Sequence, residues 1–228
     1  MTHILCIETT TDICSVCIAT DGLLVSMRET PRSYSHSEVI TVFIEECLIE
    51  AGISASELAA VAVSFGPGSY TALRIGSSTA KGICFAMDIP LISVDTMKAL
   101  AVGIVAEAKE GDLIIPMIDA RRKEVYHAIY DHILTEVQIV EPLILDDTTF
   151  QNLSNKGDIH FCGDGVTKSK DILNLSKSVF HDVEACSKHM IEEAFAKFHA
   201  NQVEDTAYYT PFYFKGPNIT VQKKNILQ

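Results

Sequence analysis

The stretch AVAVSFGPGSYTALRIG, residues 60–76, decides the fold. Its first six residues are mostly apolar and predict a buried strand. Residues 66–69 predict a tight loop, and a helical pattern then runs from Tyr70 to Met87 before Asp88 and Pro90 end it. A strand that leads through a glycine-containing loop into a long helix is typical of an α/β domain.

Two interpretations of the loop Gly66-Pro67-Gly68-Ser69 stay open. Free backbone N–H groups and the helix dipole favour an anion there, which makes Gly66, Gly68 and Ser69 candidate phosphate or nucleotide contacts. Alternatively, the glycines serve only the unusual backbone angles of a tight turn. The loop has no Walker lysine and does not match the dinucleotide-binding pattern GxGxxG, so the motif alone does not decide between them.

The first thirty residues predict three strands, about 4–8, 13–19 and 23–29, with Asp21-Gly22 as a hairpin signal between the last two. Antiparallel strands at the start argue against a simple Rossmann domain. After the first strand, Glu8-Thr9-Thr10 is either a second phosphate contact, through Thr9 and Thr10, or an ordinary hairpin turn. The missing glycine favours the turn, because glycine would let a phosphate approach the backbone closely.

Residues 113–119 repeat this layout: an apolar strand ends in Asp119, a polar turn follows, and further strands come next. Asp119 is a candidate anion contact at a strand end, or a solvated turn charge. The repeat predicts two α/β lobes related by duplication, residues 1–110 and 111–228, with the last helix or tail packing back on the first lobe.

Two helices carry features of a contact surface. In the first, about 36–51, Val39, Val42 and Ile49 lie away from the apolar face among acidic residues that include Glu46. They form either a partner surface or ordinary surface scatter. In the second, 70–87, small residues recur at helical spacing, and Gly76 and Gly82 each cost ~1 kcal/mol relative to alanine. Close approach of another backbone would offset this cost, and that backbone belongs either to this chain's own sheet or to a partner.

Composition excludes several classes of function. The formal charge is −12 and is shared equally by residues 1–100 and 101–228. Direct binding of nucleic acid phosphates by this chain is therefore not expected. No apolar run is long enough for a membrane span, and the first residues lack a signal-peptide pattern, which predicts a cytoplasmic protein.

The seven cysteines are expected to be buried thiols; Cys14 and Cys17 would lie on opposite faces of a strand. Histidine spacing predicts no metal site: the residue one turn after His36 is Ile40.

Residues 66–76, GPGSYTALRIG, resemble the GPGSFTGLRIG motif of the TsaB (YeaZ) family. Residues 80–82, 36–38, 51–52 and 118–126 fall where that family has its other motifs. The resemblance is dense over residues 4–130 and faint afterwards. It implies an α/β, actin-like/Hsp70-like ATPase (ASKHA) fold, with two lobes that each hold a mixed sheet flanked by helices.

The resemblance also implies a function. Members of this family are non-catalytic subunits needed to form N6-threonylcarbamoyladenosine in ANN-decoding tRNAs. They pair with the paralogue TsaD, which holds the metal, and support binding of the ATPase TsaE; the same surface forms homodimers. The chain would contact tRNA only indirectly, would require no cofactor, and would bind ATP or ADP at most weakly, alone or at the TsaD interface. The alternative function is an ATP-binding small-molecule kinase or a glycoprotease-like peptidase.

From the two helices together we expect a partner interface at ten positions: Val39, Val42, Glu46, Ile49, Leu73, Arg74, Gly76, Ser77, Ala80 and Lys81. No catalytic residue and no metal ligand is predicted.

Overall fold

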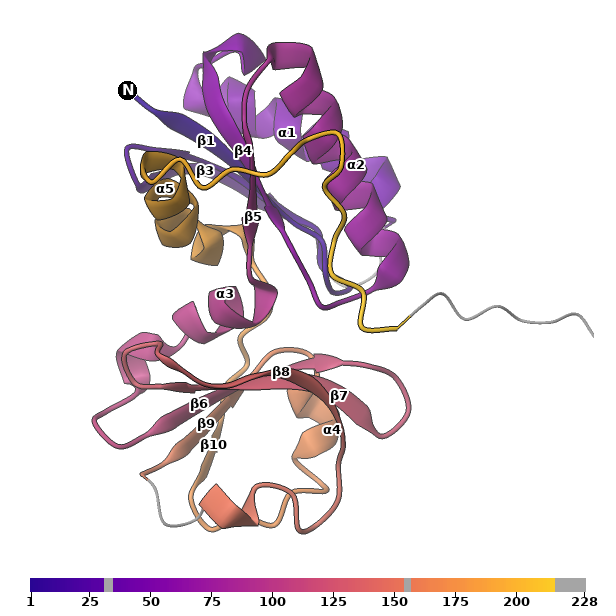
Figure 1. Cartoon of the computed structure of the whole chain (residues 1–228), viewed down its shortest axis with the longest axis vertical. Helices are drawn as coiled ribbons and strands as arrows, with labels where there is room; N and C mark the ends of the chain where they lie inside the picture. Colours follow the sequence, from indigo (N-terminus) through magenta and orange to yellow (C-terminus); the bar gives the residue numbers. More distant parts are fainter. Residues whose placement is uncertain (31–34, 154–156, 216–228) are drawn as a thin grey trace, which may run out of the picture.

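The computed structural model describes residues 1–30, 35–153 and 157–215 and has two lobes, one above the other in Figure 1. The first lobe is built from β1 (His3–Glu8), β2 (Ser15–Thr20), β3 (Leu23–Glu29), α1 (His36–Ala51), η1 (Ala55–Glu57), β4 (Leu58–Ser64), α2 (Tyr70–Met87) and β5 (Leu91–Val94). The chain continues through α3 (Thr96–Val102), η2 (Val105–Glu107), β6 (Leu113–Asp119), β7 (Glu124–Asp131), β8 (Glu136–Ile144), η3 (Gln151–Leu153), β9 (Ile159–Cys162), α4 (Val166–Ser169) and β10 (Ser178–Phe180). It ends with η4 (Ser187–Met190) and α5 (Ile191–His199).

The two sheets have the same topology. The first has the strand order β3-β2-β1-β4-β5 and the second the order β8-β7-β6-β9-β10. In each sheet the central strand pairs antiparallel with the strand that follows it and parallel with a strand reached by a crossover. This shared order confirms the expected actin-like α/β fold and the repeated layout seen in the sequence.

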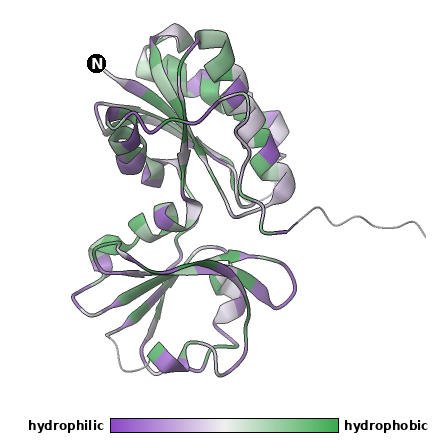
Figure 2. Cartoon of the chain, in the orientation of Figure 1, coloured by the Kyte–Doolittle hydropathy of each residue, from purple (hydrophilic) through white to green (hydrophobic). Residues whose placement is uncertain are grey.

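Helices cover both faces of the first sheet. α1 and α2 pack on one face, over a core that includes Ile7, Val16 and Val63, and α5 packs on the other, against Ile4 and Ile92. Strands β1, β2, β4 and β5 are largely hydrophobic (Figure 2), because both of their faces are buried, whereas the edge strand β3 is partly exposed. Cys14 belongs to the first core and Cys17 to the second, which confirms that they lie on opposite faces.

Helix α3 and the C-terminal segment connect the lobes. Ala99 of α3 packs against the first sheet, whereas Met97 and Leu100 pack against the second. After α5, the segment 201–215 (the tail) runs back along α2 and ends between the lobes (Figure 1). Its backbone pairs with Phe65, which accepts a hydrogen bond from the Phe212 N–H at 2.8 Å.

Most predicted elements are confirmed, with some local differences. α1 begins at His36 and ends before Gly52, whose φ is 69°. Asp95 caps α3, because its carboxylate accepts the Lys98 N–H at 2.8 Å. The Thr96 hydroxyl accepts the Gly66 N–H at 3.0 Å. All seven cysteines are buried and free. Among the described helices, none is long and apolar enough to cross a membrane.

The small residues of α2 pack against this chain's own first sheet. Ala72, Leu73, Gly76, Ser77 and Ala80 are buried. A Cβ at Gly76 would overlap the Thr9 hydroxyl oxygen, which is fixed by a 2.9 Å hydrogen bond to the Ala72 carbonyl. Gly82 differs, because a Cβ there would meet nothing within 4 Å. Packing among the described residues therefore explains the glycine at position 76 but not the glycine at position 82.

The two helical glycines give a matched prediction. Gly76→Ala should lower the free energy of unfolding by about 1–3 kcal/mol, because the new methyl group overpacks a fixed buried contact. Gly82→Ala should raise it by about 1 kcal/mol, because alanine restricts the unfolded chain and fits open space. Urea denaturation of both variants measures the two changes. Equal effects of the same sign would contradict the assignment of Gly76 to internal packing.

Candidate functional site: the cleft between the lobes

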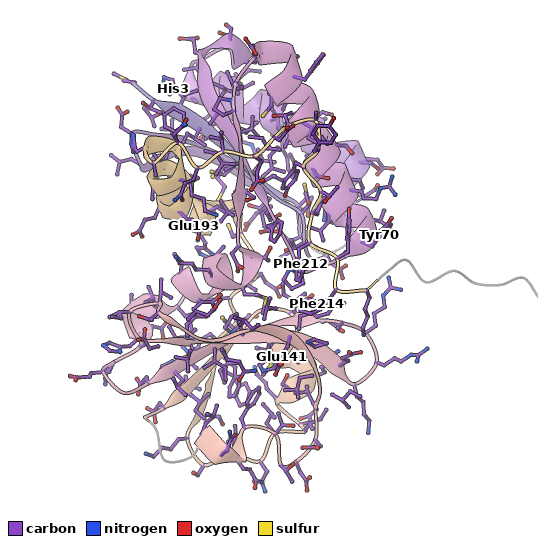
Figure 3. All side chains as sticks on the ribbon, viewed as in Figure 1. His3, Tyr70, Glu141, Glu193, Phe212 and Phe214 are labelled. Atoms are coloured by element: carbon purple, nitrogen blue, oxygen red, sulfur yellow. The ribbon has the colours of Figure 1, made fainter. Side chains whose placement is uncertain are left out.

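A cleft of about 490 Å³ lies between the lobes. Turns from both sheets and the tail line it, and Figure 3 shows Phe212 and Phe214 of the tail at the junction of the lobes, with Tyr70 at the start of α2. The lining residues are Thr10, Thr11, Asp12, Gly68, Ser69, Tyr70, Thr71, Ile118, Asp119, Ala120, Arg121, Tyr126, Asp164 and Lys215.

The turn after β1 is closed by its own carboxylate. Glu8 is fully buried, and its Oε1 accepts hydrogen bonds from the Thr10 N–H at 2.6 Å and the Thr10 hydroxyl at 2.5 Å. Its Oε2 has no partner in the described part of the chain. Burial raises the pKa of Glu8, and the hydrogen bonds from Thr10 partly oppose that shift. The Thr10 amide is therefore already engaged by an internal acceptor.

The equivalent turn after β6 is closed in the same way. Asp119 accepts the Arg121 N–H at 2.5 Å, two residues further on, and also pairs with the Lys168 ammonium at 2.5 Å. The Asp119 N–H is donated to the Asp164 carboxylate at 2.8 Å. Both strand-end acids are thus bound by side chains and amides of this chain.

The loop at 66–69 owes its glycines to close packing. Gly66 has φ 110°, and a Cβ there would come within 2.7 Å of the Phe212 carbonyl. A Cβ at Gly68 would lie 2.5 Å from the Thr10 carbonyl, which also accepts the Ser69 N–H at 2.8 Å. These contacts supply the structural reason for the glycines that the sequence left open.

Four of the six predicted anion contacts line the cleft together: Thr10, Gly68, Ser69 and Asp119. Thr9 and Gly66 do not. Thr9 is buried against α2, and Gly66 is covered by the tail. The backbone N–H groups of Thr10, Ser69 and Arg121 already donate to carboxylates or carbonyls of this chain. They could bind a phosphate only by breaking these internal hydrogen bonds.

The described residues contain no group of three or more His, Cys, Asp or Glu side chains that could hold a metal ion. Ile40, one turn after His36, is buried in the core of the first lobe. An apolar side chain therefore fills the position where a second histidine ligand would have to lie.

The outer faces of α1 and α2 form a second candidate surface, and only some of the ten expected interface residues lie on it. Leu73, Gly76, Ser77 and Ala80 lie on the inner side of α2, which packs on the first sheet. They are buried and therefore do not form a surface in this structure. Val39 packs on the core of the first lobe. The Lys81 ammonium donates to the tail carbonyls of Ala207 and Tyr209, both at 3.1 Å.

The remaining predicted contact residues are on or near the surface. Val42 and Ile49 are 46% and 72% exposed, and Arg74 is exposed. Glu46 is half-buried and pairs with Arg28 at 2.8 Å. Sequence reasoning missed Phe85, which is 87% exposed on the outer side of α2. The signal was present in the helical spacing of Ser78, Gly82 and Phe85, but the buried small-residue stripe concealed it.

We define the docking face as six residues on the outer sides of α1 and α2: Val42, Ile49, Arg74, Ser78, Gly82 and Phe85. Three of its residues, Val42, Ile49 and Phe85, are exposed apolar side chains, and it includes a helical glycine that no contact among the described residues explains.

Comparison with known proteins places the chain in a tRNA-modification family. The model of the family described as "TsaD: tRNA N6-adenosine threonylcarbamoyltransferase" matches residues 30–207. A tRNA threonylcarbamoyladenosine biosynthesis protein TsaB from Escherichia coli (strain K12) is 37% identical over 130 residues, 56% of this chain and 54% of that protein. The chain therefore spans about half the length of the curated relatives it matches.

Two further likenesses agree with this. A tRNA N6-adenosine threonylcarbamoyltransferase from Streptococcus sanguinis (strain SK36) is 55% identical over 65 residues, 28% of this chain and 19% of that protein. A crystal structure from Pseudomonas aeruginosa, described as an uncharacterized protein with similarity to peptidase YEAZ, superposes with a TM-score of 0.81 at 20% identity. It covers 94% of this chain and 100% of that chain, which shows a shared fold. The resemblance to TsaB (YeaZ) proteins is confirmed.

The buried Glu8 predicts a pH-dependent stability. Its raised pKa means that the unfolded chain ionises first, so stability should fall as the pH rises above the ordinary carboxyl value of 4.5. Glu8→Gln keeps the shape and the acceptor for Thr10 but cannot ionise. The variant should therefore be more stable than the wild type at pH 7, and the difference should shrink towards pH 4. Thermal unfolding across this range is the measurement; a difference that grows in acid would contradict the burial argument.

Proposed function

The chain belongs to the family described as TsaD: tRNA N6-adenosine threonylcarbamoyltransferase, and from this we propose that it serves the formation of N6-threonylcarbamoyladenosine in tRNA as a non-catalytic subunit. In this proposal it docks on a catalytic TsaD paralogue and supports the binding of TsaE. The names of its TsaB relatives support the pathway. The docking face supports the role within it.

The observation that carries the proposal is Gly82. A glycine inside an exposed helix costs about 1 kcal/mol relative to alanine. Among the residues that the structure describes, none lies within 4 Å of a Cβ placed there, so none of them requires that cost. A partner backbone lying against α2 would require it, because glycine allows two helices to approach more closely than any other residue.

The neighbours of Gly82 suit such a contact. Phe85 lies one turn further on and is almost fully exposed, and Ile49 on the adjacent α1 is 72% exposed. Aromatic and aliphatic side chains of this kind supply most of the binding energy when a partner covers them. The same face can pair with a second copy of this chain, so homodimer and heterodimer would be alternative states of one surface.

The cleft favours a non-catalytic role for this chain over that of a kinase or a peptidase. A kinase of this fold would need donors for a triphosphate, and the amides of Thr10 and Arg121 already bond to Glu8 and Asp119. We therefore propose that the chain needs no cofactor and that ATP or ADP binds at most weakly, in the cleft or at the TsaD interface. The assembly would work in the cytoplasm, where its tRNA substrate is found.

The activity test is reconstitution. This chain alone should form no threonylcarbamoyladenosine on an ANN-decoding tRNA, and the paralogue with the ATPase and the activated threonylcarbamoyl donor should form little. Adding the chain should restore formation, measured by mass spectrometry of digested tRNA. Product made by the chain alone, or full activity without it, would contradict the proposal.

The docking test uses two isoleucines of nearly equal exposure. Ile49→Glu, on the docking face, should weaken binding to the TsaD paralogue by at least tenfold, because a carboxylate at a covered apolar contact loses its hydration. Ile139→Glu is the control: Ile139 is 68% exposed but lies on β8 of the other lobe. Calorimetric titration of the paralogue into each variant gives the two affinities. Similar losses in both variants would remove α1 from the interface.

A further inference from the structure

The turn between β6 and β7 holds two arginines in an unfavourable backbone conformation. Arg121 and Arg122 have φ values of 72° and 57°. A side chain in this left-handed region costs about 1–2 kcal/mol per residue, and hairpin turns that need two such angles strongly prefer Asn-Gly. Strain of this kind persists where the surroundings fix it, and it clusters at functional sites.

Hydrogen bonds to Asp119 and Lys168 hold the backbone of this turn. The Arg121 N–H is bound by Asp119, and the Lys168 ammonium donates to the carbonyls of Arg122 at 3.2 Å and Glu124 at 2.5 Å. These contacts hold the backbone of the turn and leave both arginine side chains exposed. Arg121 lines the cleft, and Arg122 follows it on the same hydrogen-bonded turn.

Aromatic rings and further cations surround the same edge. The rings of Tyr70 and Tyr213 have centroids 4.7 Å apart, and the Arg74 guanidinium lies 5.6 Å from the Tyr70 ring. The Lys215 ammonium lies 5.9 Å from the ring of Tyr126. We call this set the basic-aromatic rim, and it comprises Tyr70, Arg74, Arg121, Arg122, Tyr213 and Lys215. Tyr70 is labelled in Figure 3, beside the end of the tail.

The rim is positive on an acidic protein. Asp119 is paired with Lys168, and Glu124 is paired with Lys215. Across residues 1–30, 35–153 and 157–215, no ion pair involves the rim residues Arg74, Arg121 or Arg122, nor the neighbouring Lys123. The cleft carboxylates that face these cations are Asp12 and Asp164. A local excess of positive charge therefore stands out from a formal charge of −12.

This combination fits a single strand of RNA. Arginines pair with phosphates, tyrosines stack on bases, and the two together are the usual means of binding single strands. A nucleoside triphosphate is a poorer fit, because the amides of Thr10, Ser69 and Arg121 already donate to acceptors of this chain. We propose that the basic-aromatic rim is a direct contact for a single-stranded RNA segment, with Arg121 and Arg122 on phosphates and Tyr70 or Tyr213 on a base.

The inference deepens the proposed function, on which the choice of RNA rests, and it differs from the indirect contact that the overall acidity predicts. Arg74 is the one residue that the rim shares with the docking face, and the proposed RNA contacts Arg121, Arg122, Tyr70 and Tyr213 lie outside that face. The two proposals can therefore fail separately.

The test replaces the arginine pair by the residues that the turn prefers, as Arg121→Asn with Arg122→Gly. The double variant should unfold at a higher temperature, because the strain is relieved, and should bind RNA more weakly. The probe is a fluorescein-labelled anticodon stem–loop RNA, followed by anisotropy at several salt concentrations. The slope of log K against log salt should become shallower by about 0.7 for each phosphate that the variant no longer binds, or about 1.4 for two.

The matched control removes two exposed lysines away from the cleft, Lys109→Gln with Lys188→Gln. It lowers the charge equally and should leave affinity and slope as in the wild type. Ile49→Glu should also bind RNA normally, which separates this test from the docking test. Tyr213→Leu should weaken binding without changing the salt slope, because it removes stacking and no charge.

Three results would overturn the proposal: an unchanged affinity and slope in the arginine double variant, an equal loss in the lysine control, or no RNA binding by a chain that still docks on the paralogue. Competition by polyglutamate as strong as that by the unlabelled RNA would assign the rim to an acidic protein instead, and would overturn it as well.

Discussion

Helix α2 lies so close to the turn after β1 that two positions of the loop–helix segment can hold only glycine. Gly76 faces the Thr9 hydroxyl, and Gly68 faces the Thr10 carbonyl. This contact joins the first strand, the glycine-containing loop and the long helix into one unit, and it sets where the cleft floor lies. The buried Glu8 completes the unit, because its carboxylate fixes the Thr10 amide from below. A bulkier residue at either glycine would move the helix and, with it, both the docking face and the basic-aromatic rim.

The same contact explains why the two surfaces are distinct. The inner side of α2 is used by its own sheet, so only the outer side, with Gly82 and Phe85, is left for another molecule. The start of α2 borders the cleft instead, where Tyr70 meets Tyr213 of the tail. One helix thus contributes its outer side to the docking face and its first turn to the basic-aromatic rim.

The sequence predicted most strands, though not β10, and it predicted both long helices and the paired layout of the lobes. These features depend on local pattern, as at Gly52 and Asp88, where α1 and α2 end. It did not predict which side of α2 is covered. Helical spacing shows that Gly76 and Ala80 share a face, but not whether the covering backbone comes from the same chain. Gly82 could be separated from Gly76 only with the neighbours of each in view. The strain at Arg121 and Arg122 was equally hidden, since arginine gives no signal of positive φ.

The two strand-end turns show what the duplicated lobes have kept and where they differ. Glu8 at the end of β1 and Asp119 at the end of β6 each accept the amide of the residue two positions further on. In the first lobe the acid is fully buried and the turn presents threonines. In the second the acid is exposed, a lysine neutralises it, and the turn presents arginines. An equal pair of turns would make a symmetric cleft suited to a polyphosphate between them. In this pair both amides are bound, and the exposed positive charge of the arginines lies on the second turn, which favours contact with an extended polyanion at the surface over a small one inside.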